Sequence, residues 1–375
     1  MEKIPVFKPV IDKNMKKHID DALNVGWLGM GKSTKEFEER IEKFLLLKNR
    51  FAIATNTGTS ALHLALKIAG IGKNDEVITP SFNYVADQQA IKMTGASVVM
   101  CDIKEKNLGI DCKKAELLIT KKTRAIIPLH FAGIPCDIDE VYRLSKKYNL
   151  RIIEDATHAF GTSINKRKIG SFGDLTCFSF DPVKIITSID GGCVVVNNKN
   201  ELEKGHNLRL LGVDKDTTER YKNKRAWDYN VVSEGYRYHL TNIMASVGIS
   251  QIKNIEKFIS SRQRVCRIFN MAFKDIKEIK VPQTDFKNIS PFIYTIRIMN
   301  GERENLINHL QKNGLDSGIH FIPVHKHSFF KSASRGDMTV TNKVVNEIMT
   351  LPLHSYMKES HVKKVVKVVT SFFKK

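Results

Sequence analysis

The chain has 375 residues, of which 42% are hydrophobic, and it carries a formal net charge of +20. This length and apolar content allow a large buried core and predict one large and one smaller domain. No stretch approaches the ~20 uninterrupted apolar residues of a membrane helix, and no apolar signal segment opens the chain, so we expect a cytoplasmic protein without membrane insertion.

The positive charge has three possible interpretations. Lysine outnumbers arginine 44 to 16, and the lysines are spread along the chain. A surface that binds nucleic acid usually clusters its basic residues in a recognisable module and relies on arginine. The pattern therefore favours a solvated lysine-rich surface over a field that attracts anionic substrates, and both over nucleic-acid binding.

The six cysteines show no C-x-x-C spacing. This pattern is typical neither of a zinc site nor of a disulfide framework. We expect free thiols, several of them buried, and no bound metal: Cys101, Cys112, Cys136, Cys177, Cys193 and Cys266.

Short apolar runs alternate with amphipathic stretches between residues 50 and 200. The expected strands cover residues 51–54, 76–79, 96–101, 124–129, 151–154, 175–180 and 193–196. The clearest expected helices cover residues 60–69, 85–93 and 138–148. This alternation predicts an α/β fold with a mostly parallel sheet, helices on both faces and ligands at the C-terminal ends of the strands.

The pattern changes after the sheet. The expected elements are a charged loop at 214–225, a long helix at 241–264, strands near 279 and 294, helices at 302–313 and 339–349, and a final helix from 359. We expect a large domain over residues 1–250, including an N-terminal arm, and a small α+β domain over residues 251–375.

A glycine-containing turn follows the first expected strand. Thr57, Gly58 and Thr59 lie where the helix at 60–69 begins. Free N–H groups, hydroxyl donors and the positive end of the helix dipole can bind a phosphate there. An ordinary helix cap is the alternative interpretation of the same residues.

Tyr84 follows the second expected strand and lies at the same edge of the sheet. Its ring could stack on an aromatic cofactor, or it could belong to the core.

A carboxylate and a lysine follow later strands. Asp155 ends the run Ile152-Ile153-Glu154-Asp155, and Lys184 lies six residues before Asp190. A lysine that forms a Schiff base and a carboxylate that pairs with a pyridinium nitrogen are two means by which proteins hold pyridoxal 5'-phosphate (PLP). Taken alone, Asp155 could also be a helix cap.

Two further residues fit the same site. Ser179 precedes Lys184 and could donate to the cofactor phosphate, or it could be a buried hydroxyl group. His158 could pack beside the cofactor or be a structural histidine. The order of phosphate turn, aromatic residue, aspartate, serine and lysine, each at or beyond a strand end, favours a PLP site.

These motifs resemble those of the DegT/StrS aminotransferases, which aminate keto groups of nucleotide-linked sugars. The similarity runs over nearly the whole chain and includes Gly26-Trp27-Leu28-Gly29, Thr57-Gly58-Thr59-Ser60-Ala61-Leu62, Pro80-Ser81-Phe82-Asn83-Tyr84-Val85-Ala86, Glu154-Asp155-Ala156-Thr157-His158-Ala159, Phe178-Ser179-Phe180, Lys184, Gly191-Gly192, Gly235-Tyr236-Arg237-Tyr238 and Leu351-Pro352-Leu353-His354.

The resemblance implies a fold-type-I PLP-dependent enzyme with a seven-stranded sheet. It implies that Lys184 is the Schiff-base lysine, that Asp155 pairs with the pyridine nitrogen, and that Tyr84 and His158 flank the ring. The turn at 57–59 would hold the phosphate together with Ser179.

Two positions depart from the family's pattern. An asparagine commonly reaches the phosphate of the neighbouring subunit, whereas Arg237 and His239 stand at the corresponding positions here. An arginine can replace that amide, because its charge strengthens the bond to phosphate. Asp190 stands where glutamate is more usual. Lys184 itself is kept, whereas related dehydratases carry histidine, and this favours amino transfer.

The resemblance also implies the reaction and the assembly. An amino acid, expected to be L-glutamate, gives its amino group and leaves as 2-oxoglutarate. The sugar is expected to be aminated at C4 of a 4-keto-6-deoxyhexose, with Tyr236 and His325 at the substrate. The product would serve a surface polysaccharide such as a lipopolysaccharide O-antigen, and the enzyme would be a homodimer with shared active sites.

Three alternatives remain open at this stage. The enzyme could act on another keto sugar, including an acidic one, or at another carbon such as C3. The chain could instead be a regulatory relative that binds PLP without turnover, although the complete set of Asp155, Ser179 and Lys184 argues against this. A basic binding protein would rest on charge alone.

Overall fold

The computed structural model describes residues 3–214 and 229–374. Most of the charged loop expected at 214–225 lies outside these described residues. An eight-stranded sheet forms the centre of an α/β fold, with strand order β1-β9-β8-β5-β4-β2-β3-β12. Only β9 among these strands runs antiparallel to its neighbours, so the mostly parallel sheet is confirmed.

The strands of this sheet are β1 (Phe51–Thr55), β2 (Glu76–Pro80), β3 (Ser97–Cys101), β4 (Thr123–Ile126), β5 (Arg151–Asp155), β8 (Leu175–Ser179), β9 (Gly192–Val196) and β12 (Ser334–Arg335). Seven of them correspond to the seven predicted strands. The eighth, β12, comes from the C-terminal part of the chain and extends the edge beside β3. A separate two-stranded hairpin joins β6 (Ser163–Ile164) to β7 (Arg167–Lys168).

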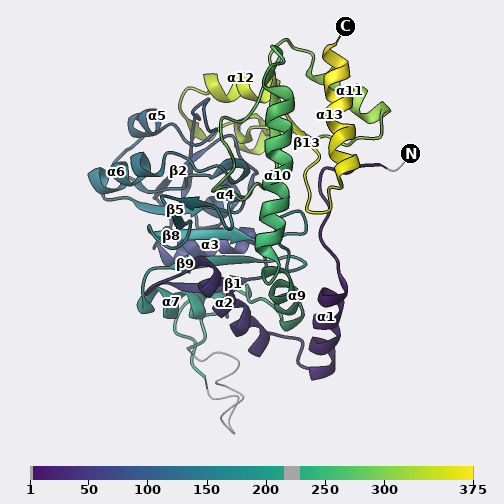
Figure 1. The fold of residues 1–375 in the computed structure, drawn as a ribbon. Helices are drawn as coiled ribbons and strands as arrows, with labels where there is room; N and C mark the ends of the chain where they lie inside the picture. The colour runs from purple at the N-terminus through teal and green to yellow at the C-terminus, as the bar shows by residue number, and fades with distance from the viewer. Residues whose placement is uncertain (1–2, 215–228, 375) are drawn as a thin grey trace.

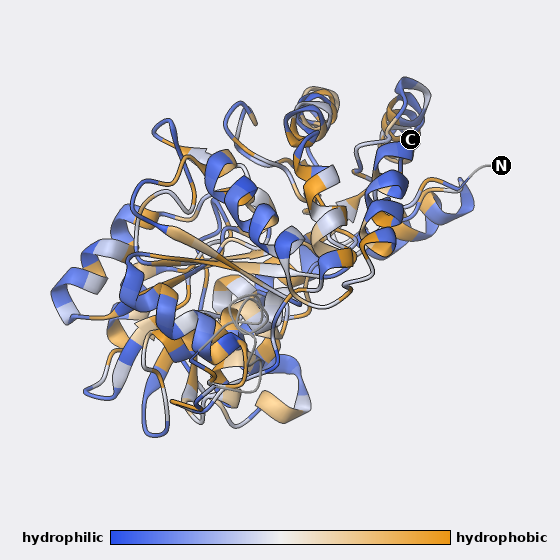
Figure 2. Ribbon diagram, turned by 90° about the horizontal axis from the view of Figure 1, so that it is seen from below, coloured by the Kyte–Doolittle hydropathy of each residue, from blue (hydrophilic) through white to orange (hydrophobic). Residues whose placement is uncertain are grey.

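Helices cover both faces of the sheet (Figure 1). One face packs against α3 (Gly58–Ile68), α4 (Ala86–Met93) and α7 (Lys199–Arg209). The other packs against α2 (Lys32–Leu45), α5 (Cys112–Leu117), α6 (Ile138–Tyr148) and α9 (Asn242–Ile252). The hydropathy colours follow this arrangement, since the strands are largely orange and the outer helices are largely blue (Figure 2).

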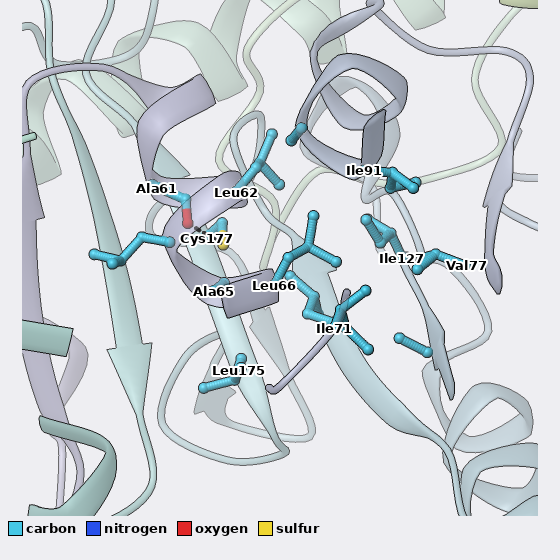
Figure 3. Packing of buried hydrophobic residues seen from close by; sticks show 14 of the residues in the cluster. Ala61, Leu62, Ala65, Leu66, Ile71, Val77, Ile91, Ile127, Leu175 and Cys177 are labelled. Atoms are coloured by element: carbon cyan, nitrogen blue, oxygen red, sulfur yellow. Dashed lines mark hydrogen bonds between the residues drawn. The ribbon is translucent and has the colours of Figure 1, made fainter. Parts of the chain in front are cut away.

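Helix α3 is more deeply buried than α4 and α7, which cover the same face of the sheet. Its residues Ala61, Leu62, Ala65 and Leu66 pack against the sheet beside Cys177, whose thiol donates to the Ala61 carbonyl over 3.6 Å (Figure 3). Thr57 caps α3, and every residue of this helix except Gly58, Thr59 and Lys67 is buried. This packing fixes the start of the helix at the sheet edge.

A second core forms in the C-terminal part. It contains the sheet β10-β11-β13, with strands Ile279–Lys280, Tyr294–Ile298 and Ile348–Leu351, and the helices α11 (Arg303–Lys312) and α13 (Glu359–Phe373). Helix α12 (Thr339–Glu347) precedes β13, and α1 (Lys13–Val25) lies in the N-terminal arm. Single-turn 3-10 helices are η1 (Phe131–Gly133), η2 (Val324–Lys326) and η3 (Ser328–Phe330).

Helix α10 (Ile255–Phe273) links the two parts. Its first residues Ile255 and Phe258 belong to the core under the large sheet, whereas Val265 and Phe269 belong to the C-terminal core. The division of the chain at residue 250 remains a proposal.

Two expected helices were wrong in extent. The long helix predicted at 241–264 is two helices, α9 and α10, which a turn at Lys253 and Asn254 separates. The reason is packing: α9 is buried from Ala245 to Ile252, whereas α10 is amphipathic and leaves the sheet for the second core. The helix predicted at 339–349 ends at Glu347, because the next residues pair with β11.

Other expectations from composition can also be compared with the structure. All six cysteines are buried and free, as predicted. Within residues 3–214 and 229–374, no helix is long and apolar enough to cross a membrane. The same residues contain no cluster of histidine, cysteine or acidic side chains that could hold a metal ion.

Candidate active site

A cavity of about 580 Å³ lies at the C-terminal ends of β2, β5 and β8, beside the start of α3. This position agrees with the expectation that ligands gather at that edge of the sheet. Its lining brings together distant parts of the chain: Phe7, Thr57, Gly58, Thr59, Leu62, Asn83, Tyr84, Ala86, Asp155, Thr157, His158, Ser179, Asp181, Val183, Lys184, Asp190, Phe292, His320 and Phe321.

Lys184 lies in the loop between β8 and β9. Its backbone N–H donates to the carbonyl of Asp181 over 3.0 Å, and its Nζ lies 4.1 Å from the centre of the Phe292 ring. Burial lowers the pKa of the Lys184 ammonium group to about 8, although the negative charges of Asp155 and Asp181 act in the opposite direction. A substantial fraction of this amine is therefore neutral near pH 8, as a nucleophile or proton acceptor requires.

Asp155 is the last residue of β5, and 3% of its surface is exposed. Its Oδ1 accepts from the N–H of Thr157 over 2.9 Å, and its Oδ2 accepts from Nδ2 of Asn83 over 3.1 Å. The chain forms turns after this strand through Gly161. The helix-cap interpretation of Asp155 is therefore wrong, and the carboxyl group faces the cavity.

The turn at 57–59 also lines the cavity. Thr57 accepts from the N–H of Ser60 over 2.9 Å, so it caps α3 and lines the cavity at once. A Cβ at Gly58 would lie 2.9 Å from Cβ and Oγ of Ser179, so only glycine allows this close approach. The N–H groups of Gly58 and Thr59 belong to the first helical turn, where the helix has no acceptor to offer.

Two rings flank the cavity. Tyr84 is 60% exposed and its ring lies 5.7 Å from that of Phe321, so its interpretation as a core residue is wrong. His158 is buried and stacks on Phe292 with ring centres 4.4 Å apart. Burial, then the charge of Lys184, lowers the pKa of His158 well below its usual range, so this imidazole is neutral.

Asp190 also lines the cavity. Its Oδ1 accepts from the N–H of Gly191 over 2.7 Å, and its carbonyl accepts from the hydroxyl of Ser188 over 2.7 Å. The aspartate thus supports the turn that returns the lysine loop to β9.

Four predicted site residues lie outside this cavity. Exposed Arg237 and half-buried His239 line a second cavity of about 480 Å³, next to the segment 26–30. Tyr236 donates its hydroxyl group to Glu234 over 2.7 Å. His325 does not line the cavity, and its two ring nitrogens lie 2.7 Å from Oγ of Ser81 and 3.2 Å from Oδ1 of Asn342.

Sequence reasoning missed several lining residues. Phe7 comes from the N-terminal arm, and Phe292 and His320 come from the C-terminal part. No periodic pattern in the sequence predicts these residues, because tertiary packing alone brings their segments to the sheet edge. Asn83 belongs to the motif at residues 80–86, but no function was predicted for its side-chain amide.

The residues around the cavity fit PLP. Its phosphate would meet the N-terminus of α3 and the hydroxyl of Ser179, its ring nitrogen would meet Asp155, and its aldehyde would meet Lys184. The buried Nδ1 of His158 has no hydrogen-bond partner among the described residues, which is the kind of orphaned atom a missing ligand leaves. Fold and site together define a fold-type-I PLP-dependent enzyme.

Comparison with known proteins narrows this class. The sequence pattern of the DegT/DnrJ/EryC1/StrS aminotransferase family matches residues 9–370. The chain is 31% identical to GDP-perosamine synthase of Caulobacter vibrioides, over 98% of this chain and 97% of that protein. It therefore belongs to the DegT/DnrJ/EryC1/StrS family of sugar aminotransferases.

Solved structures agree with this assignment. PseC of Helicobacter pylori, an aminotransferase involved in the biosynthesis of pseudoaminic acid, superimposes with a TM-score of 0.91 at 26% identity over the whole of both chains. A Streptococcus pneumoniae relative, 27% identical over 99% of both chains with a TM-score of 0.91, is known in a PMP form and also in a PLP form. PLP is accordingly the cofactor of this aminotransferase.

Proposed function

We propose that this enzyme transfers the amino group of L-glutamate to C4 of a nucleotide-linked 4-keto-6-deoxyhexose, for a surface polysaccharide such as an O-antigen or for another glycoconjugate. The observation that supports this proposal most is that Lys184 and Asp155 line one cavity together with the N-terminus of helix α3 at Gly58. The names of two relatives support a sugar product. GDP-perosamine synthase is named after a GDP-linked sugar, and PseC is an aminotransferase involved in the biosynthesis of pseudoaminic acid.

We assign the cofactor-binding roles residue by residue. Thr57, Gly58, Thr59 and Ser179 hold the phosphate with hydroxyl and backbone N–H donors. Asp155 holds the pyridine nitrogen in its protonated form, since a carboxylate stabilises that charge. Tyr84 and His158 flank the ring.

When bound, PLP carries the amino group and withdraws electrons from the carbon that loses a proton. Lys184 has two tasks in this reaction. Its amine would hold the cofactor, and the same amine, when free, would take the proton from Cα of the amino acid as a base and give it up again as an acid. The ring of Phe292 lies 4.1 Å from Nζ, and the lowered pKa of this amine suits a proton acceptor near neutral pH.

The sites are shared across a homodimer in this proposal. Arg237 is exposed on the surface that also carries exposed Trp27 and Leu28, and no carboxylate among the described residues forms an ion pair with it. An exposed arginine beside apolar surface suits a partner subunit's phosphate. Tyr236 and His325 are then assigned to the sugar substrate, with Tyr236 reaching across the interface.

A panel of nucleotide-linked 3-keto and 4-keto sugars tests the proposal. Each sugar is incubated with the PLP-loaded enzyme and 15N-labelled L-glutamate, and the product is examined by NMR. We expect 15N on C4 of a 6-deoxyhexose with equal formation of 2-oxoglutarate. Label on another carbon, or transfer only to an acidic sugar, would replace this substrate assignment while leaving the reaction class intact.

A further inference from the structure

Asp87 is a buried carboxyl group to which the proposed mechanism gives no role. It lies in the first turn of α4 with 0% of its surface exposed. The titratable groups that face it are Asp155 on β5 and the thiol of Cys177 on β8. Two carboxyl groups therefore lie together beneath the cavity, in an environment that disfavours two negative charges.

One amide ties the two carboxyl groups together. Asn83 Nδ2 donates to Oδ2 of Asp87 over 2.7 Å and to Oδ2 of Asp155 over 3.1 Å. The orientation of this amide is fixed, because its Oδ1 accepts from the N–H of Tyr84 over 2.7 Å. The hydroxyl group of Thr79 adds a second donor to Oδ2 of Asp87 over 3.2 Å.

The other carboxyl oxygen of Asp87, Oδ1, does not take part in these hydrogen bonds. Oδ1 is buried and has no hydrogen-bond partner among residues 3–214 and 229–374. A proton on Asp87 would make this side chain a donor, and it lies within hydrogen-bonding reach of the Asp155 side chain. Burial, and then the negative charge of Asp155, raises the pKa of Asp87 well above its usual range.

We propose that Asp87 and Asp155 share a single proton, with Asp87 as the neutral acid that donates to Asp155, and that Asp87 is thereby a positioning residue for the cofactor's nitrogen partner. Asn83 orients both groups. The charge of Asp155 stays single and directed at the cavity, while the thiol of Cys177 remains neutral because burial raises its pKa. The consequence for PLP rests on the proposed role of Asp155; the protonation state of Asp87 does not.

Infrared difference spectroscopy tests the protonation state on the cofactor-free protein. The spectrum of wild type minus Asp87→Asn at neutral pH is expected to contain the C=O stretch of a protonated carboxyl group, which shifts on 13C labelling of aspartate. Asp102→Asn is the matched control, since Asp102 is also buried but Lys114 Nζ donates to it over 2.6 Å and holds it as a carboxylate. A difference spectrum of Asp87 that shows only carboxylate bands would overturn the proposal.

PLP binding tests the positioning role. An asparagine keeps a donor toward Asp155, whereas an alanine removes it. Loss of a hydrogen bond to a charged group corresponds to roughly a 10- to 150-fold change in dissociation constant. We expect Asp87→Ala to raise the PLP dissociation constant by about that factor and Asp87→Asn to restore most of it. Equal weakening by both variants would contradict the donor role.

The two proposals fail in different ways. If Asp155 does not contact the cofactor, Asp155→Asn and both Asp87 variants bind PLP like wild type. The infrared difference spectrum still contains the C=O band of protonated Asp87. If Asp87 is ionised, the band is absent even though Asp155→Asn still weakens PLP binding.

Discussion

The two faces of strand β5 carry neighbouring carboxyl groups with different surroundings. Glu154 points to the face covered by α6, where the hydroxyl of Tyr142 donates to it over 2.6 Å and Nε2 of His130 over 3.0 Å. Asp155 points to the cavity face, where it meets Asn83 and Thr157. Both are almost fully buried. Burial therefore does not distinguish a structural carboxylate from a functional one.

What separates the two faces is the space beside each carboxyl group. Around Glu154, side chains fill the site and their donors satisfy both oxygens. Around Asp155, a cavity of about 580 Å³ remains, with the neutral ring of His158 and the amine of Lys184 on its walls. We infer that the α6 face of β5 stabilises the fold and that the cavity face binds PLP. Each prediction below tests one side of this difference.

The largest effect is expected on the cavity face at Lys184. Lys184→Ala should lower amino transfer by at least ~1000-fold, because a methyl group can neither bind the cofactor covalently nor move the proton. Transfer rates and the visible absorbance of the PLP-loaded protein measure the effect. Lys168→Ala, on the β6–β7 hairpin, is the control and should keep both. Residual transfer within about tenfold of wild type would refute the assignment of Lys184.

The second effect concerns the charge of Asp155. Asp155→Asn keeps the size of the side chain and removes its charge, so turnover should fall at least ~100-fold, the scale seen when a transition-state charge partner is lost. PLP should also bind more weakly, which a fluorescence titration of the cofactor-free protein measures. Normal turnover with normal cofactor content would leave Asp155 a purely structural role.

The third effect tests whether the cavity face is completed by a second subunit. A charge-assisted bond to phosphate is worth roughly 1.5 to 3 kcal/mol, so Arg237→Ala should raise the PLP dissociation constant by roughly 10- to 150-fold. Mixing this variant with Lys184→Ala should restore part of the activity, because one of the two sites in a mixed dimer is then intact. If subunits exchange and the mixture stays inactive, Arg237 serves its own subunit.

The smallest effect on catalysis is expected on the α6 face. Glu154→Gln disturbs the bonds from Tyr142 and His130 and should cost about 1 to 3 kcal/mol of unfolding free energy, as for a hydrogen bond to a buried charge. Turnover and PLP affinity should change little. Urea denaturation and steady-state rates measure the two quantities. A loss of turnover as large as that of Asp155→Asn would abolish the distinction between the two faces.

The fold was largely predictable because its elements are periodic and local. Apolar runs of four to six residues between amphipathic stretches located seven strands of the large sheet. Strand β12 could not be predicted, since two residues at 334–335 carry no pattern and only their pairing with β3 makes them a strand. The turn between α9 and α10 was missed because Lys253 and Asn254 are compatible with a continuing helix.

The site was predictable where its residues follow strands. Asp155, Ser179, Lys184 and the turn at 57–59 meet in the cavity as the sequence indicated. Asp87 was missed, since an acidic residue in a first helical turn is ordinarily a solvated partner of the helix dipole. Its burial against Asp155 depends on how α4 packs on the sheet, which no local signal shows.

The central claim is that Lys184, among 44 lysines, is the residue that binds PLP. Borohydride reduction of the PLP-loaded protein makes the bond between cofactor and lysine permanent, and mass spectrometry of the digested chain locates it. The account predicts a pyridoxyl group on the peptide that contains Lys184. A pyridoxyl group at another lysine, with Lys184 unmodified, would contradict it.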